Sequence, residues 1–396
     1  MTGVGYNGCM VFRALAVGAA AAALLMPGSA RADLRAVADG DAPVLAGDSV
    51  LWASGGRLLG ATLAGAAVPP VGLPVGADDV QLAAGSGLVA ALVGSRVYSL
   101  AGAAFVPVAG GVRGGAELFA TAFGPLVVGD DGRARLRGAE VAVPPGALAL
   151  AAAGEYGVAA TGDGALVVFD LRTGTELWTV SLGRFDAATL SGLAVGADGS
   201  VAAAVPVGDG SDVLLWAPPS AADVRVLARG QGFGTVVVDG ARVAYVAGTR
   251  LGERVRVVDA RSGAIVFRGP AVASVSALAF SGDAIAFSTP GCTVAGGASG
   301  SFRSLPAGVC VRSSVTVTAL AGRGVRVQVA CVSAVGAACR VRARVRGRVI
   351  GARSASVRVG RTRTLVVPVR RARGSGVRVT VRVLDPDGRS RVAFPG

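Results

Sequence analysis

Residues 148–180 read LALAAAGEYGVAATGDGALVVFDLRTGTELWTV, and this stretch decides the fold. It contains four short runs, at 148–153, 156–160, 166–170 and 176–180, and a turn that contains Gly separates each run from the next. Short runs that are rich in Val, Leu and Ala and are bounded by Gly or Asp-Gly are typical of antiparallel strands. The stretch therefore predicts a four-stranded sheet, and its small, apolar first strand should be buried on both faces.

The same unit recurs from about residue 43 to residue 306. A glycine marks the first turn of each repeat, and successive glycines lie 30 to 44 residues apart, at Gly47, Gly85, Gly124, Gly154, Gly196, Gly240 and Gly282. A period near 40 residues with four short strands per repeat is typical of a β-propeller blade. We predict an all-β fold with a β-propeller of about seven blades. Six or eight blades stay open because the third repeat is short.

A strand that precedes the first repeat could close the propeller. Residues 34–37 read LRAV. We expect them to pair with the outer strand of the last blade, near Ser301–Leu305, because such pairing would cover an open sheet edge.

Two repeats contain a more specific motif. Residues 169–178, FDLRTGTELW, and residues 258–267, VDARSGAIVF, resemble the repeats of pyrroloquinoline-quinone-type propellers. In such a turn Asp accepts backbone hydrogen bonds, Gly adopts the left-handed conformation, and the aromatic residue packs between blades. The resemblance implies the architecture only. The quinoproteins use adjacent cysteines beside their cofactor, and this chain has no such pair, so no cofactor is expected.

The N-terminus has the pattern of an export signal. A single Arg precedes an apolar run at 14–26, and Ala30-Arg31-Ala32 fits a cleavage site with small residues. We predict a signal peptide over 1–32 and an extracellular or envelope-associated mature protein; Met10 is an alternative start. The other interpretation, a membrane anchor, is disfavoured because the run is short for a bilayer, and no transmembrane span is expected elsewhere.

The cysteines fit an exported protein. Apart from Cys9 in the predicted signal peptide there are four: Cys292, Cys310, Cys331 and Cys339. An even number predicts two disulfides, and of the three possible pairings sequence proximity favours 292–310 and 331–339. A metal site is disfavoured because the chain has neither His nor Cys-x-x-Cys spacing.

The charge distribution changes sharply after Cys310. Residues 313–396 hold 18 Arg and two acidic residues, a net charge of +16, whereas residues 1–312 carry −2. Val alternates with Arg along much of this region, as in a half-buried antiparallel sheet. We predict a propeller over 33–312 and a small immunoglobulin-like β-sandwich over 313–396. The basic region resembles the Arg-rich C-terminal sandwiches of exported actinobacterial proteins.

One basic segment alternates without a break: Arg340, Arg342, Arg344, Arg346 and Arg348. On a strand these residues would share one face at a spacing of about 6.5–7 Å. Guanidinium groups bind phosphate and carboxylate groups in a bidentate manner, so the five residues are candidates for anion binding. The alternative is a solvated face in a chain whose 39 basic residues are all Arg.

As partners we expect a protein or an anionic envelope polymer. Nucleic acid is not expected, because no aromatic residues are interleaved for base stacking.

The composition also restricts the chemistry. Without His, catalysis by Ser-His-Asp or Cys-His groups and metal binding through His are excluded. The acidic turn 209–212 offers too few oxygen ligands for Ca²⁺. No catalytic and no metal-binding residue is therefore predicted.

We expect a monomeric, non-catalytic binding or scaffold protein that the basic domain tethers to envelope polymers. The alternative is an extracellular hydrolase that works through carboxylates alone. Acidic residues that converge at one mouth of the channel would favour this alternative.

Overall fold

A computed structural model describes most of the chain after residue 34. The described residues are 35–38, 41–63, 66–74, 80–109, 116–183, 185–207, 210–249, 252–269, 274–289, 292–297, 314–320, 324–331, 338–347, 349–358, 361–371, 377–384 and 390–393. The predicted signal peptide and Cys310 lie outside them. Within them the protein is all-β, with a single short 3-10 helix, η1 (Ala187–Thr189).

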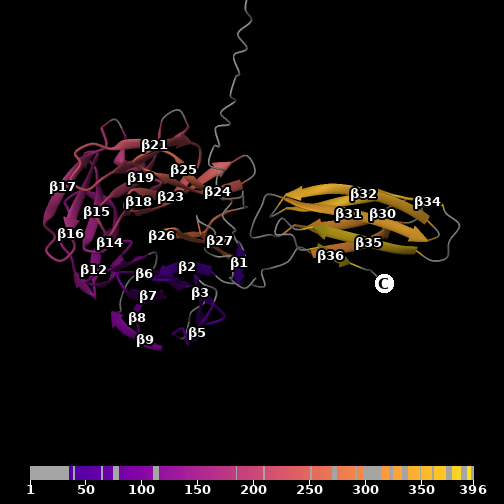
Figure 1. Ribbon diagram of the computed structural model, residues 1–396, viewed down its shortest axis with the longest axis horizontal. Helices are drawn as coiled ribbons and strands as arrows, with labels where there is room; N and C mark the ends of the chain where they lie inside the picture. The colour runs from indigo at the N-terminus through magenta and orange to yellow at the C-terminus, as the bar shows by residue number, and fades with distance from the viewer. Residues whose placement is uncertain are drawn as a thin grey trace, which may run out of the picture.

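Seven four-stranded antiparallel sheets form the propeller, and they follow one another round a ring (Figure 1). Blades one to six each consist of four consecutive strands. These are β2 (Asp41–Ala46), β3 (Ser49–Ser54), β4 (Arg57–Thr62) and β5 (Ala67–Gly72); β6 (Val80–Gly85), β7 (Leu88–Val93), β8 (Arg96–Ala101) and β9 (Ala104–Ala109); β10 (Glu117–Thr121), β11 (Gly124–Val128), β12 (Ala134–Leu136) and β13 (Ala139–Glu140); β14 (Ala147–Ala153), β15 (Tyr156–Thr161), β16 (Ala165–Asp170) and β17 (Glu176–Ser181); β18 (Gly192–Val195), β19 (Val201–Pro206), β20 (Asp212–Ala217) and β21 (Arg225–Gly230); β22 (Phe233–Asp239), β23 (Arg242–Thr249), β24 (Gly252–Asp259) and β25 (Ile265–Arg268).

Blade seven joins the two ends of the propeller. Its strands β26 (Ala277–Ser281), β27 (Ala284–Thr289) and β28 (Cys292–Gly297) are completed by β1 (Arg35–Ala38), which pairs antiparallel with β28. Closure by an N-terminal strand is therefore confirmed. The expected partner near Ser301–Leu305 was wrong, because β28 is only the third strand of its blade and β1 itself supplies the fourth.

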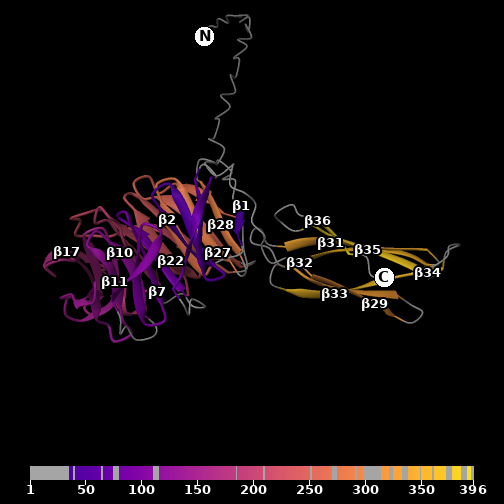
Figure 2. The same ribbon diagram turned by 90° about the horizontal axis from the view of Figure 1, so that it is seen from below.

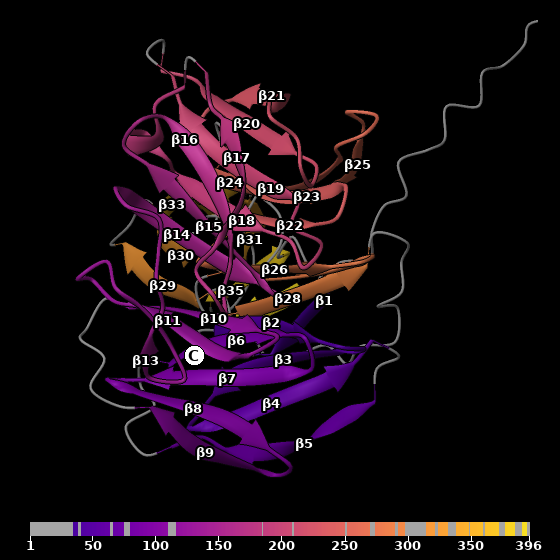
Figure 3. The same ribbon diagram turned by 90° about the vertical axis from the view of Figure 1, so that its left-hand side faces the viewer.

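Packing between neighbouring blades forms the core. The first strands gather round the middle of the ring, and outer strands such as β5, β9 and β21 lie towards its edges (Figure 3). Phe267 of blade six packs with Phe280 and Phe287 of blade seven, and Trp52 of blade one packs against Ala286 of blade seven. The ring is thus sealed by apolar contacts as well as by the β1–β28 pairing.

The motif turns form as predicted from the sequence. Asp170 Oδ1 accepts hydrogen bonds from the backbone nitrogens of Arg172 and Thr173. Both bonds lower the pKa of Asp170, and the bond from Thr173 has the larger effect. Gly174 has a φ of +72°. Trp178 reaches the next blade: a Cβ added at Gly199 would lie 2.6 Å from its ring. The aromatic residue therefore packs between blades, as expected.

The last eight strands form two sheets. One contains β29 (Ser314–Leu320), β30 (Gly324–Ala330) and β33 (Thr362–Pro368), and the other has the order β34 (Arg370–Arg371), β32 (Val349–Arg358), β31 (Ala338–Gly347), β35 (Val377–Leu384) and β36 (Ser390–Ala393). The sheets lie in two layers, with β29 and β33 below β31, β35 and β36 in Figure 2. The inward residues, mainly Val, make one buried cluster. This is an immunoglobulin-like sandwich. The predicted boundary at 312/313 falls outside the described residues and stays a prediction.

A disulfide joins Cys331 to Cys339, with 5.8 Å between the Cα atoms, and both residues are buried in the sandwich core. This pairing is one of the two that sequence proximity favoured. The other, Cys292–Cys310, involves a residue outside the described ones and stays a prediction.

We expect the double change Cys331→Ala/Cys339→Ala to destabilise the sandwich by about 2–3 kcal/mol, because the bridge closes a short loop of the unfolded chain. Chemical unfolding of the sandwich transition measures this loss. Addition of a reductant to the parent protein should reproduce the shift, and a double variant with an unchanged midpoint would contradict the prediction.

Candidate functional site

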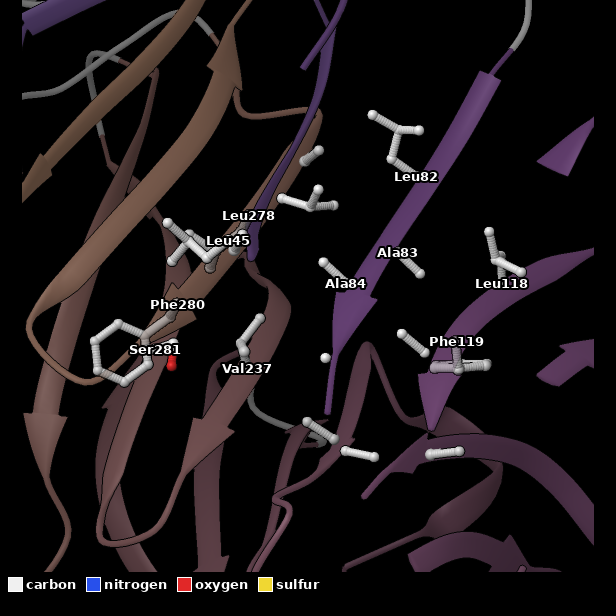
Figure 4. A pocket seen from close by; sticks show the side chains of 18 of the residues that line it. Leu45, Leu82, Ala83, Ala84, Leu118, Phe119, Val237, Leu278, Phe280 and Ser281 are labelled. Carbon is white, nitrogen blue, oxygen red and sulfur yellow. The ribbon is translucent and has the colours of Figure 1, made fainter. Parts of the chain in front are cut away.

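The first strands of the seven blades enclose a central channel with a volume of about 1140 Å³. Its lining is mainly apolar: of the ten side chains labelled in Figure 4, only that of Ser281 carries a polar atom. Leu45, Leu82, Leu118 and Leu278 line this space from four different blades. The small residues of the first strands allow seven strands to approach one another this closely.

Two acidic residues line the channel, and they do not converge. Glu117 begins β10, whereas Asp239 ends β22; because the first strands of all blades run in the same direction, the two carboxylates lie towards opposite mouths. Partial burial raises the pKa of Glu117. Asp239 Oδ2 accepts a hydrogen bond of 2.5 Å from the Gly282 nitrogen and thereby links blade six to blade seven. In the described part of the channel, Glu117 therefore has no second carboxylate beside it.

The candidate arginines lie on the central strand of the five-stranded sheet. In β31, Val341, Ala343 and Val345 point into the core, so Arg340, Arg342, Arg344 and Arg346 point outwards. Arg344 is half-buried and the other three are exposed. Arg348 lies outside the described residues. The structure thus brings four of the five candidates onto one face.

The strands on either side of β31 complete this face. In β35, Arg382 is paired with Arg342 and Arg378 with Arg346. In β32, Ser356 is paired with Arg340 and Ser354 with Arg342. The sequence showed that Arg378 and Arg382 alternate with Val, but it could not show which strand they lie beside. The two serines carried no signal in the sequence.

A shallow depression of about 630 Å³ marks one end of the face. It is lined by Arg340, Arg342, Arg382, Ser354, Ser356, Val341, Ala355 and Leu384. Three guanidinium groups and two hydroxyl groups offer hydrogen-bond donors there. We call the outward residues Arg340, Arg342, Arg344, Arg346, Ser354, Ser356 and Arg382 the arginine face.

The arginine face has no acidic residue to neutralise it within the sheet, because residues 314–384 contain neither Asp nor Glu. Directly opposed residues of an antiparallel pair have Cβ atoms about 4.5–5.5 Å apart, and like charges at such positions are destabilising. The Arg342–Arg382 pair is therefore unfavourable unless an anion lies between the two guanidinium groups.

Among the described residues, no group of three or more Cys, Asp and Glu side chains is arranged to hold a metal ion. The helices of the described segments include none with the length and hydrophobicity needed to cross a membrane.

Comparisons with known proteins identify no family. No family model and no curated protein matches the chain. Among solved structures, BamB from Moraxella catarrhalis is similar at 14% identity and a TM-score of 0.41, over 67% of this chain and 96% of that one. U3-55K is similar at 14% identity and a TM-score of 0.46, over 67% of this chain and 98% of that one. Assignment of the propeller rests on the seven sheets described above.

Proposed function

We propose that the chain is an exported, non-catalytic binding protein whose sandwich holds it on an anionic polymer of the cell envelope. The observation that carries the proposal is the pairing of arginines across β31 and β35, without an acidic residue in the sheet. Export rests on the signal-peptide pattern of residues 1–32.

The arginine face suits a ligand with repeated negative charges. Along β31 the outward guanidinium groups follow one another at about 6.5–7 Å, and β35 adds Arg382 beside Arg342. A polymer lying along the strands can neutralise several arginines in turn, whereas a single small anion neutralises one or two. The binding should be driven by the release of counterions from the polymer, as it is for proteins on nucleic acids.

The propeller supports a binding role in this proposal. Its blades form a closed, rigid ring that presents loops on both faces, which is how such scaffolds commonly display contact residues. The alternative, a hydrolase that works through carboxylates alone, needs two acidic groups within about 5–10 Å. Glu117 is the one carboxylate in the described channel lining with a raised pKa, and Asp239 accepts a hydrogen bond from the Gly282 nitrogen of blade seven.

We expect the full chain with Arg340, Arg342, Arg344 and Arg346 changed to Gln to lose its retention on phosphocellulose at physiological salt. The alternation with inward residues means that the variant keeps its core. A plot of the logarithm of the binding constant against that of the salt concentration should become less steep by about 3, because four charges are removed.

A matched control removes four exposed arginines from the propeller instead, at Arg57, Arg96, Arg172 and Arg261. This control has the same net charge as the test variant, so it should keep most of the retention if the arginine face is the binding surface. An equal loss of retention in both variants would show that net charge alone causes retention and would contradict the proposal. Retention on isolated cell envelope from the source cells then tests the natural polymer.

A further inference from the structure

Blade six carries a second cluster of basic residues, far from the arginine face in the sequence. Arg254 and Arg256 lie two residues apart in β24 and therefore on the same face of the sheet. Arg268 in β25 is paired directly with Arg256. On the other side of β24, Tyr245 in β23 is also paired with Arg256. Four side chains that can donate hydrogen bonds thus share one face.

This face is turned towards blade five. Tyr245 belongs to the buried cluster that contains Leu214 and Trp216 of blade five, and its ring lies edge-on to Phe233 at 5.1 Å between centroids. Arg254 and Arg256 are half-buried and Arg268 is exposed. The cluster is therefore covered in part by protein and reached by solvent from its outer side.

Buried donors in the cluster have no partner. The Nε atoms of Arg254 and Arg256 and the hydroxyl group of Tyr245 are all buried without a hydrogen-bond partner in the described part of the protein. They are three of the five such side-chain atoms there. Tyr245 is fully buried, so its hydroxyl group cannot turn out to water. An unpaired buried polar group destabilises the fold, so three of them on one face are unlike an ordinary blade surface.

The charges of the cluster are also unbalanced. In the described segments no carboxylate lies within 4.0 Å of the three guanidinium groups. Two acidic residues of blades five and six accept backbone hydrogen bonds instead: Glu253 accepts from the Val275 nitrogen at 2.6 Å and Asp212 from the Phe233 nitrogen at 2.6 Å. Burial, followed by repulsion from Arg256 and Arg268, lowers the pKa of Arg254.

We propose that Arg254, Arg256 and Arg268, with Tyr245 packed beneath them, form a binding site for a phosphate dianion, either inorganic phosphate or the terminal monoester of a small ligand. Three positive charges within one cluster favour a doubly charged anion over a carboxylate. The four oxygens of phosphate can accept hydrogen bonds from several guanidinium groups together. The site lies in the propeller and does not rest on the proposed function of the sandwich.

Isothermal titration of inorganic phosphate into the full chain, at constant ionic strength, tests the site. A second arm uses glycerol 1-phosphate, and tighter binding of this monoester would assign the phosphate to a larger ligand. The double variant Arg254→Gln/Arg256→Gln should bind phosphate at least tenfold more weakly. The variant Tyr245→Phe removes a hydroxyl group that surrounding side chains cover, so it should leave phosphate binding unchanged. The control Arg57→Gln/Arg96→Gln removes two exposed arginines of blades one and two and should leave phosphate binding unchanged.

Thermal unfolding separates a ligand site from a structural role. In phosphate-free buffer the double variant should melt at or above the parent temperature, because the change relieves repulsion between unneutralised arginines. With phosphate the parent should gain stability and the variant should not. A variant that melts lower without phosphate, or acetate binding as tightly as phosphate, would overturn the proposal. Loss of phosphocellulose retention in the arginine-face variant leaves these results unchanged, so the two proposals fail separately.

Discussion

A chain that starts at residue 39 is expected to lose about 3–4 kcal/mol of unfolding free energy relative to a chain that starts at residue 33, and to aggregate at high concentration. The truncation removes β1, which covers the outer edge of β28 through antiparallel pairs such as Ala36 with Val294. Each lost ladder hydrogen bond contributes about 1 kcal/mol. The exposed edge of β28 also becomes available to strands of other molecules.

Chemical unfolding and size-exclusion chromatography over a range of protein concentrations measure the two effects. The control keeps the length and backbone of β1 but changes Arg35 and Val37 to Ala, and its loss should be much smaller because the pairing with β28 is through backbone groups. A truncated protein that stays monomeric with the parent midpoint would show that the apolar contacts between blades one and seven are sufficient for closure.

The strands of the blades could be predicted because their signals are local. In blade four, the predicted run 156–160 corresponds to β15 at Tyr156–Thr161, and 176–180 corresponds to β17 at Glu176–Ser181. The turn in blade two was placed one residue too early. Gly85 was aligned as its first-turn glycine, but the turn consists of Ser86 and Gly87, with φ values of +50° and +75°. The segment contains both Gly85 and Gly87, and only the register between β6 and β7 decides which of them lies in the turn.

The candidate sites depend on pairings that the sequence does not contain. Alternation placed the arginines of β31 on one face, but Arg382 lies 40 residues further along the chain, and only the position of β35 beside β31 sets it opposite Arg342. The cluster in blade six is similar. Arg254 and Arg256 alternate with Val255 and Val257 in the sequence, but their partial burial follows from the packing of blade five over the same face.

The change Phe169→Ala is expected to cost about 3–5 kcal/mol, because the ring is 2% exposed and its removal leaves a cavity in blade four. The ring fills the space over Gly157, which is its cross-strand partner. A Cβ built on Gly157 would lie 2.4 Å from the Phe169 Cζ atom, closer than real contacts allow. Gly157 therefore lacks a side chain because Phe169 occupies that position, and the two residues should depend on each other energetically.

A double-mutant cycle tests this dependence. Gly157→Ala alone should cost about 1–3 kcal/mol by overpacking, but in the Phe169→Ala background it should be neutral or stabilising, because the new methyl group enters the cavity. Gly162→Ala serves as the control in the same blade: a Cβ added there would lie 4.0 Å from its nearest neighbour, a Leu148 methyl carbon, so its cost should be small and the same in both backgrounds. Additive costs for Gly157→Ala and Phe169→Ala in urea unfolding would mean that the backbone shifts to admit the methyl group, and the close approach would then not explain the glycine.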